Sequence, residues 1–194
     1  MKPRCYISGV AFAAYLELVA CWIVWWYPFI LRAPHRQKRE SIALPGATRV
    51  GLLLEAASFA VALWFRLPSG TDPGLLRIVP AMVLAPLGPI LGWTAVVHLG
   101  RQFRITAGLY HDHELVRTGP YALVRHPIYA SLLAMLLGTG LLLSSWLGLF
   151  LALAIFVTGT EIRVAAEEKL LASRFGESFQ AYRQNVPAYL PWVR

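Results

Sequence analysis

Charged residues and cysteines are scarce in this 194-residue chain. Only 14% of the residues are charged and 57% are hydrophobic, whereas a soluble domain usually carries about 25% charge. The two cysteines, Cys5 and Cys21, lie in one apolar segment, where a helix would hold them about 24 Å apart. A disulfide between them would break that helix, so the cysteines predict no disulfide framework.

Motifs of soluble nucleotide-binding enzymes and of zinc enzymes are also missing. The chain has no G-x-G-x-x-G, no G-x-x-x-x-G-K-[ST], no H-E-x-x-H and no cysteine pair with metal-ligand spacing. We therefore expect no metal site. The net charge of +8 does not predict nucleic-acid binding, because the basic residues cluster at the ends of apolar runs, where membrane topology and anionic lipid explain them.

What the chain has instead is apolar runs longer than the roughly 18 residues that suggest a membrane-spanning helix. They predict an all-α, polytopic membrane helix bundle that forms a single integral membrane domain, 1–194. Residues 1–100 would supply scaffold spans and residues 101–194 a catalytic motif region. About five transmembrane helices are expected, at 5–31, 50–65 and 75–99 and as a hairpin of two short helices within 127–159.

Several details refine this prediction. The first run is too long for a signal peptide and ends in an aromatic belt that includes Trp22 and Trp25. A Gly88-x-x-x-Gly92 spacing in the third run allows close helix approach. The hairpin is expected to turn at Ser144-Ser145-Trp146, and a separate C-terminal amphipathic helix is expected over 161–182, with a break at Gly176.

The distribution of Lys and Arg predicts the orientation. The first loop, 32–49, holds five of them, 101–125 holds four and 161–194 holds five. The positive-inside rule places these segments in the cytosol and the amino terminus outside. A prokaryotic inner membrane is the expected location. Glu17 and Glu55 lie inside predicted spans, where a carboxylate is costly, so we expect both to hydrogen-bond within the bundle.

The segment 113–129, HELVRTGPYALVRHPIY, is the strongest functional signal. Polar and ring-bearing residues at a membrane boundary are costly to keep unless they bind something. Each Xaa-Pro step pushes the preceding residue, Gly119 or His126, out of the helical region. Pro127 suits the first position of the next helix, whose free backbone N–H groups would face the loop. The segment predicts a pocket for a polar, ring-containing ligand.

A second polar cluster follows the last apolar run. Arg163 and Glu167 are four residues apart and share a helix face, whereas Glu168 on a neighbouring face is expected to be a solvated charge. An ordinary surface pair on a helix is the alternative interpretation of Arg163 and Glu167. The predicted topology puts both clusters on one face of the membrane, so we interpret them as two halves of one site.

The two clusters together resemble the isoprenylcysteine carboxyl methyltransferase family. The resemblance covers about 103–194 and is carried by HELV, Gly-x-Tyr, Arg-His-Pro-x-Tyr and Glu-Glu, in that order. It implies a multi-span helical fold and S-adenosyl-L-methionine as the methyl donor. Carried over by motif, the cofactor would be bound by His113, Glu114, Leu115, Val116, Tyr121, His126, Pro127, Ile128, Tyr129 and Glu167.

The same resemblance implies that Arg163 holds the acceptor carboxylate, which makes Arg163 and Glu167 the candidate catalytic residues. Thr106 stands where eukaryotic members have a cofactor-contacting glutamine. A carboxylate acceptor is already ionised at neutral pH, so its methylation needs positioning and exclusion of water rather than a base. The expected acceptor is a prenylated or other lipophilic molecule in contact with membrane lipid.

Three alternatives remain open at this point. A phospholipid or small-molecule N- or S-methyltransferase would use the same scaffold, with Glu167 or Glu168 as the base for an amine acceptor. An NADPH-dependent membrane reductase would need a basic cluster for the cofactor phosphate. A transporter or non-enzymatic scaffold would place its polar residues inside the spans rather than at one face.

Overall fold

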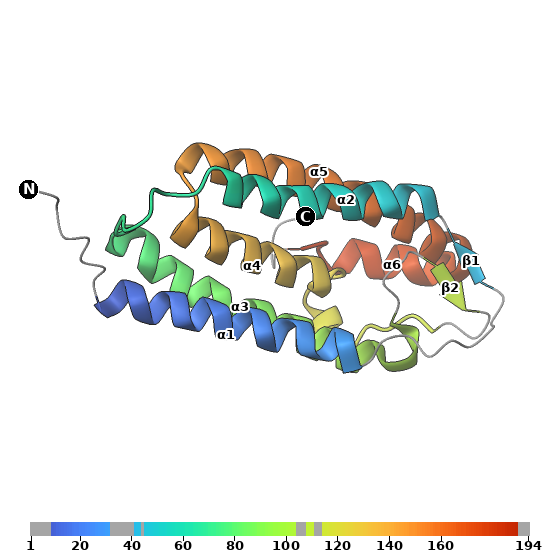
Figure 1. Cartoon of the computed structure of the whole chain (residues 1–194). Helices are drawn as coiled ribbons and strands as arrows, with labels where there is room; N and C mark the ends of the chain where they lie inside the picture. The colour runs from blue at the N-terminus through green and yellow to red at the C-terminus, as the bar shows by residue number, and fades with distance from the viewer. Residues whose placement is uncertain (1–8, 32–40, 44, 104–107, 111–113, 190–194) are drawn as a thin grey trace, which may run out of the picture.

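Five helices form an elongated bundle (Figure 1). The computed structural model describes residues 9–31, 41–43, 45–103, 108–110 and 114–189. The helices are α1 (Gly9–Leu31), α2 (Pro45–Trp64), α3 (Leu75–Leu99), α4 (Pro127–Leu143) and α5 (Trp146–Phe175). Helix α2 packs along α5, and α3 packs between α4 and α1. In the described part of the chain, α1, α2, α3 and α5 are long and apolar enough to cross a membrane, and α4 is a shorter apolar helix. The predicted polytopic helix bundle is confirmed.

The predicted helical hairpin is right in its turn and wrong in its second helix. Ser144 ends α4, and the Ser145 side chain caps α5 by accepting a hydrogen bond from the Gly148 N–H at 3.2 Å. Helix α5 then continues for 30 residues to Phe175, because no proline interrupts it. Residues 161–175 therefore belong to α5 and not to a separate amphipathic helix.

At 1.5 Å per residue, α5 is about 45 Å long, whereas the hydrocarbon core of a bilayer is about 30 Å thick. The end of α5 therefore has the length to reach past the membrane interior. The predicted break at Gly176 is confirmed: its φ is 50°, and the short helix α6 (Glu177–Asn185) starts after it.

One end of the bundle gathers all the short elements (Figure 1). The strands β1 (Ser41–Ala43) and β2 (Gly108–Tyr110) form an antiparallel ladder in which Ile42 faces Leu109. The all-α prediction did not include this ladder. It lets the backbone N–H and C=O groups of two loop segments form hydrogen bonds with each other. The 3-10 turns η1 (Gly100–Gln102) and η2 (Gly119–Ala122) lie at the same end.

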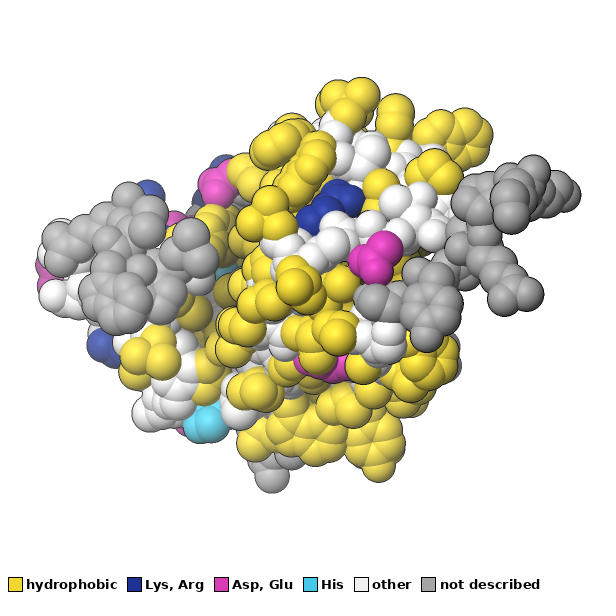
Figure 2. Space-filling view, turned by 90° about the vertical axis from the view of Figure 1, so that its left-hand side faces the viewer, with side chains coloured by type: hydrophobic (Ala, Val, Ile, Leu, Met, Phe, Trp, Pro, Cys, Tyr) yellow, Lys and Arg dark blue, Asp and Glu magenta, His cyan; other side chains and the backbone are white. Residues whose placement is uncertain are grey.

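The opposite end of the bundle is closed by backbone contacts between two connections. The Leu67 N–H donates to the Leu143 carbonyl at 2.7 Å, and the Ser145 N–H donates to the Phe65 carbonyl at 2.7 Å. Buried Arg77 donates to the Ser144 carbonyl at 2.5 Å and lies over the Trp146 ring. Hydrophobic side chains cover most of the face seen from this end, with only a few charged groups among them (Figure 2).

Glycines allow close approach at three helix pairs. In α3, a Cβ added to Gly88 would lie 2.4 Å from the Met135 sulfur of α4, and one added to Gly92 would lie 3.1 Å from the Trp25 indole nitrogen of α1. The close approach predicted from this glycine spacing is confirmed. Between α2 and α5, a Cβ on Gly159 would lie 2.8 Å from the Gly51 carbonyl oxygen.

Gly159→Ala is expected to destabilise the protein by about 1–3 kcal/mol, the usual cost of overpacking a close-packed contact. The added Cβ would meet the Gly51 backbone and the Leu54 Cβ, neither of which is the far end of a flexible side chain. Gly46→Ala in α2 is the matched control, because a Cβ there would meet nothing within 4 Å. Thermal unfolding in detergent measures both variants, and equal melting temperatures would contradict the expectation.

Candidate active site

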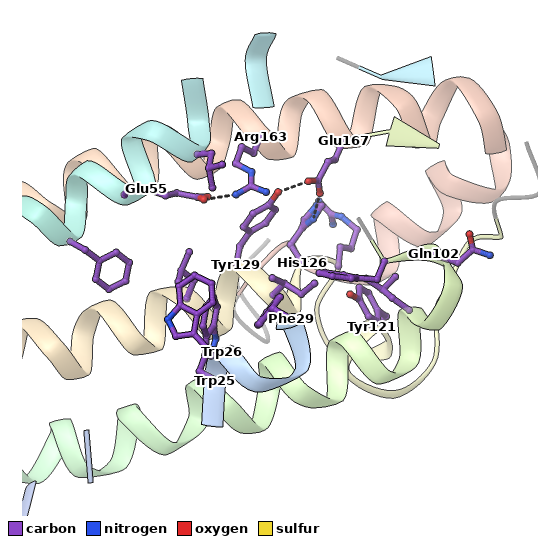
Figure 3. A pocket seen from close by; sticks show the side chains of 18 of the residues that line it. Trp25, Trp26, Phe29, Glu55, Gln102, Tyr121, His126, Tyr129, Arg163 and Glu167 are labelled. Atoms are coloured by element: carbon purple, nitrogen blue, oxygen red, sulfur yellow. Dashed lines mark hydrogen bonds and ion pairs between the residues drawn. The ribbon is translucent and has the colours of Figure 1, made fainter. Parts of the chain in front are cut away.

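A cavity of about 770 Å³ opens at the end of the bundle that holds the loops (Figure 3). Helices α1, α2, α4 and α5 contribute to its wall, together with the loop that leads into α4. Nine of the predicted site residues line it: Glu114, Leu115, Val116, Tyr121, His126, Ile128, Tyr129, Arg163 and Glu167. The two clusters that were predicted to form one site thus face the same cavity. Pro127 is fully buried at the start of α4 and does not line the cavity, and His113 and Thr106 lie outside the described residues.

The local sequence explains how the loop enters this wall. Gly119 has a φ of 61°, and a Cβ there would lie 2.2 Å from the His98 ring, so only glycine fits. Pro120 is the second residue of the 3-10 turn that buries Tyr121. His126 is the N-cap of α4 with a φ of −126°, outside the helical region, and Pro127 follows at the first helical position, as the Xaa-Pro steps predict.

A row of polar side chains crosses the cavity wall from α2 to α5 (Figure 3). Arg163 Nη1 donates to Glu55 Oε2 at 2.5 Å, and the Arg163 guanidinium lies 4.8 Å from the centroid of the Tyr129 ring. The Tyr129 hydroxyl donates to Glu167 Oε1. His126 Nδ1 lies 3.7 Å from the other Glu167 oxygen. Glu167 is thus held by a phenol and an imidazole rather than by a guanidinium.

Glu168 is a buried hub and not the solvated charge that the sequence predicts. Its exposed fraction is only 9%. It accepts from Arg125 Nε at 3.0 Å and from His126 Nε2 at 3.2 Å, and it lies 3.3 Å from Arg183 Nε of α6. The prediction is wrong because the partners come from the loop before α4 and from α6, whose positions around α5 the helix pattern does not contain.

Backbone hydrogen bonds from the segment after α6 hold the loop before α4 in place. The Arg125 N–H donates to the Pro187 carbonyl at 2.8 Å, and the His126 N–H donates to the Ala188 carbonyl at 2.9 Å. The Tyr182 hydroxyl donates to the Tyr121 carbonyl at 2.6 Å.

Burial keeps both tyrosines of this region neutral. It raises the pKa of Tyr121 well above its ordinary value and the pKa of Tyr182 to about 12. Both phenols therefore keep their protons at neutral pH, so Tyr182 can remain a hydrogen-bond donor and neither phenol serves as a base.

The deeper part of the cavity is apolar. Aromatic and aliphatic side chains of α1, α2 and α4 line it: Leu18, Trp22, Trp25, Phe29, Phe59, Leu63, Leu132 and Leu143. The Trp22 and Trp25 indoles donate to Thr139 and Ser131 of α4, each at 3.1 Å, so these rings reach into the bundle interior. The interfacial belt predicted from the sequence stays a prediction. Val19 and Leu52 line the cavity and are also 56% and 42% exposed. The cavity therefore opens sideways, toward the lipid-facing surface flanked by α1 and α2.

The comparisons with known proteins fit this site. Residues 76–178, more than half of the chain and most of the polar wall, match the model of the phospholipid methyltransferase family. The chain belongs to this family. Several relatives carry the name that the motif resemblance predicts. The protein-S-isoprenylcysteine O-methyltransferase of Schizosaccharomyces pombe is 35% identical over 109 residues, which cover 55% of this chain and 46% of the relative. The protein-S-isoprenylcysteine O-methyltransferase B of Arabidopsis thaliana is 31% identical over 109 residues, 55% of each chain.

A third relative of this chain has a different name. The cobalt-zinc-cadmium resistance protein CzcN of Cupriavidus metallidurans is 34% identical over 137 residues, which cover 61% of this chain and 62% of the relative. Among the described residues, no three His, Cys, Asp or Glu side chains are grouped so as to hold a metal ion. The chain spans about half the length of the isoprenylcysteine methyltransferases it matches.

Three parts of the cavity wall were not predicted from the sequence. Glu55 was recognised as a costly carboxylate inside a span, but its partner Arg163 lies 108 positions away. Gln102 lines the cavity from the 3-10 turn that follows α3, where no motif marks it. The aromatic residues of α1 were assigned to a membrane interface. Sequence spacing does not reveal these contributions, because the wall is assembled from helices that are distant in the chain.

Proposed function

We propose that this protein is an integral membrane methyltransferase that uses S-adenosyl-L-methionine to methylate the carboxylate of a prenylcysteine-like or other lipophilic acceptor. One observation carries the proposal: a single cavity joins the Glu55–Arg163–Tyr129–Glu167 row to an apolar groove that opens toward lipid. Family membership and the names of the relatives support it. We further propose that the site faces the cytosol, because the start of α2, the turn η2 and helix α6, which lie at this end of the bundle, belong to the Lys- and Arg-rich segments of the sequence. A prokaryotic inner membrane is the proposed location.

The residues present fit this cofactor. Arg125 and Arg163 are each paired with a carboxylate, whereas Glu167 faces the cavity bonded to a neutral phenol. The remaining charge beside Tyr129 is therefore negative, which favours a cationic ligand. The rings of Tyr121, His126 and Tyr129 offer surfaces for an aromatic base. When bound, S-adenosylmethionine supplies a methyl group on a positively charged sulfur that leaves as a neutral thioether.

The chain's own residues then have three tasks. Arg163 would orient the acceptor carboxylate so that one of its oxygens faces the methyl group that the cofactor supplies. No proton moves, so Glu167 acts by position and charge and not as a base. Trp22, Phe59 and Leu143 line the apolar groove that takes the hydrocarbon chain and excludes water from the polar row.

The alternative is N- or S-methylation of a phospholipid or small molecule on the same scaffold. The description of the matching family names phospholipid as the acceptor, which favours this second candidate. A protonated amine has to lose its proton before it attacks, and Glu167, at the cavity wall, is the group placed to accept it.

Calorimetric titration with S-adenosylhomocysteine tests the cofactor assignment on the detergent-purified protein. We expect saturable binding by the wild type, no binding of NADPH, and at least about tenfold weaker binding by His126→Ala, because His126 contacts both Glu167 and Glu168. Methyl transfer to an S-farnesylcysteine acid, compared with a lipid amine, then separates the two acceptor classes. A folded wild type that binds NADPH and not S-adenosylhomocysteine would overturn the methyltransferase proposal.

A further inference from the structure

Glu55 is a buried carboxylate that the proposed chemistry leaves without a task. Its exposed fraction is 2%, and it lies within α2, ten residues after the start of that helix. Its Oε2 accepts from Arg163 at 2.5 Å, and its Oε1 accepts from the Thr160 hydroxyl at 3.2 Å. Glu55 also lines the cavity, so it borders the space in which the acceptor head group would sit.

The stability of the bundle does not explain this pair. Removing two charges from water costs about as much as their attraction returns, and an apolar pair of the same volume is often equally stable. Helices α2 and α5 already pack closely where Gly51 meets Gly159 and the Arg163 side chain. An ion pair that is retained at this contact, on a cavity wall, points to a role in binding.

The geometry leaves Arg163 able to change partners. The Tyr129 ring supports the guanidinium through its face, and such a contact does not fix which oxygen the N–H groups bond. The ring is itself held by its hydroxyl on Glu167. Glu55 has a second donor in Thr160, so its carboxylate keeps a hydrogen bond when Arg163 turns away.

We propose that Glu55 is an exchangeable counter-ion and a positioning residue for Arg163, which trades it for the acceptor carboxylate and returns to it after methylation. This inference rests on the proposed function, because it requires a carboxylate acceptor. The acceptor is an anion and can compete for the guanidinium, whereas the methyl ester is neutral and cannot. Glu55 would therefore weaken binding of the acid moderately, and the neutral ester would leave Arg163 paired with Glu55.

Glu55→Gln tests the exchange, because it removes the negative charge and keeps the size and an acceptor oxygen. The probes are an S-farnesylcysteine acid and its methyl ester, titrated into detergent-purified protein saturated with S-adenosylhomocysteine. We expect the acid to bind about tenfold more tightly to Glu55→Gln than to the wild type, since the competing charge-assisted bond is gone. We expect the affinity for the ester to stay within about twofold, so that the ratio of ester to acid dissociation constants rises about tenfold.

Controls separate this inference from a structural role and from the proposed function. Ser58→Ala removes a fully buried hydroxyl one turn along α2 that donates to the Glu55 backbone carbonyl and not to its carboxylate, and it should leave both affinities unchanged. Weaker or equal binding of the acid by Glu55→Gln would overturn the exchange and leave a purely structural pair. A wild type that binds S-adenosylhomocysteine but not the acid would overturn the carboxylate acceptor and the exchange together. Glu55→Met provides a second measurement, with the same expected direction, where the glutamine variant does not fold.

Discussion

Arg163→Ala is expected to lower kcat/KM for a carboxylate acceptor at least about a hundredfold. The affinity for S-adenosylhomocysteine is expected to change less than about threefold. The reason is that Arg163 is the guanidinium at the junction of the polar row and the apolar groove. Loss of an oriented, desolvated cation costs several kcal/mol, and each 1.4 kcal/mol is about tenfold in rate. Turnover and calorimetric titration of the same preparation measure both quantities.

Two further variants control this experiment. Arg163→Ala leaves Glu55 buried beside Thr160 without its guanidinium, so a loss of folding must be distinguished from a loss of chemistry. The double variant Arg163→Ala/Glu55→Ala removes both charges and should fold and bind S-adenosylhomocysteine, yet remain inactive. Lys169→Ala removes an exposed cation from the same helix and should be fully active. Full turnover by folded Arg163→Ala would remove Arg163 from the proposed mechanism.

Glu168→Ala is expected to have the largest effect on stability, about 3–5 kcal/mol, the usual cost of breaking a buried charge pair by removing one partner. Arg125 would keep its positive charge with an exposed side-chain fraction of only 11%, and His126 would lose the acceptor that orients its ring. Binding of S-adenosylhomocysteine should fall at least about tenfold for the same reason. Thermal unfolding, followed by tryptophan fluorescence, measures the destabilisation.

The matched control for this variant is Glu177→Ala. Glu177 is an exposed carboxylate in the first turn of α6, where the helix dipole favours it by about 0.3–1 kcal/mol. Glu168→Gln should fall between the two, because its amide oxygen still accepts one hydrogen bond. Equal melting temperatures for Glu168→Ala and the wild type would show that the hub is not needed for stability.

Segment length and local chemistry made much of the fold predictable. The third helix was predicted at 75–99 and is found at Leu75–Leu99, because Gly74 and Gly100 punctuate a long apolar run. The end of α4 at Ser144 was also predictable, because Ser144-Ser145-Trp146 interrupts the long apolar run 127–159. The length of α5 was not, since the change from apolar to charged composition at Glu161 looks like a boundary although the backbone continues through it.

In the candidate site, likewise, some features were predictable from the sequence and others were not. Backbone conformation at Gly119 and His126 follows from each residue's own identity and from the proline that comes next, so the loop was predictable. The partners of Arg163 and Glu168 were not, because an ion pair between distant segments leaves no periodic trace in one sequence. Even neighbouring positions differ: Glu167 faces the cavity and Glu168 faces α6, since successive residues of a helix point about 100° apart.

The backbone hydrogen bonds between 125–126 and 187–188 have a consequence for how the protein folds during its synthesis. The loop is synthesised before α4 and α5, and its hydrogen-bond donors find their acceptors only after both helices and α6 have followed. During synthesis at the membrane, the spans therefore insert first, and the backbone N–H groups of Arg125 and His126 depend on water until the later segment arrives. Assembly of this end of the bundle is thus a late folding event, separate in time from membrane insertion.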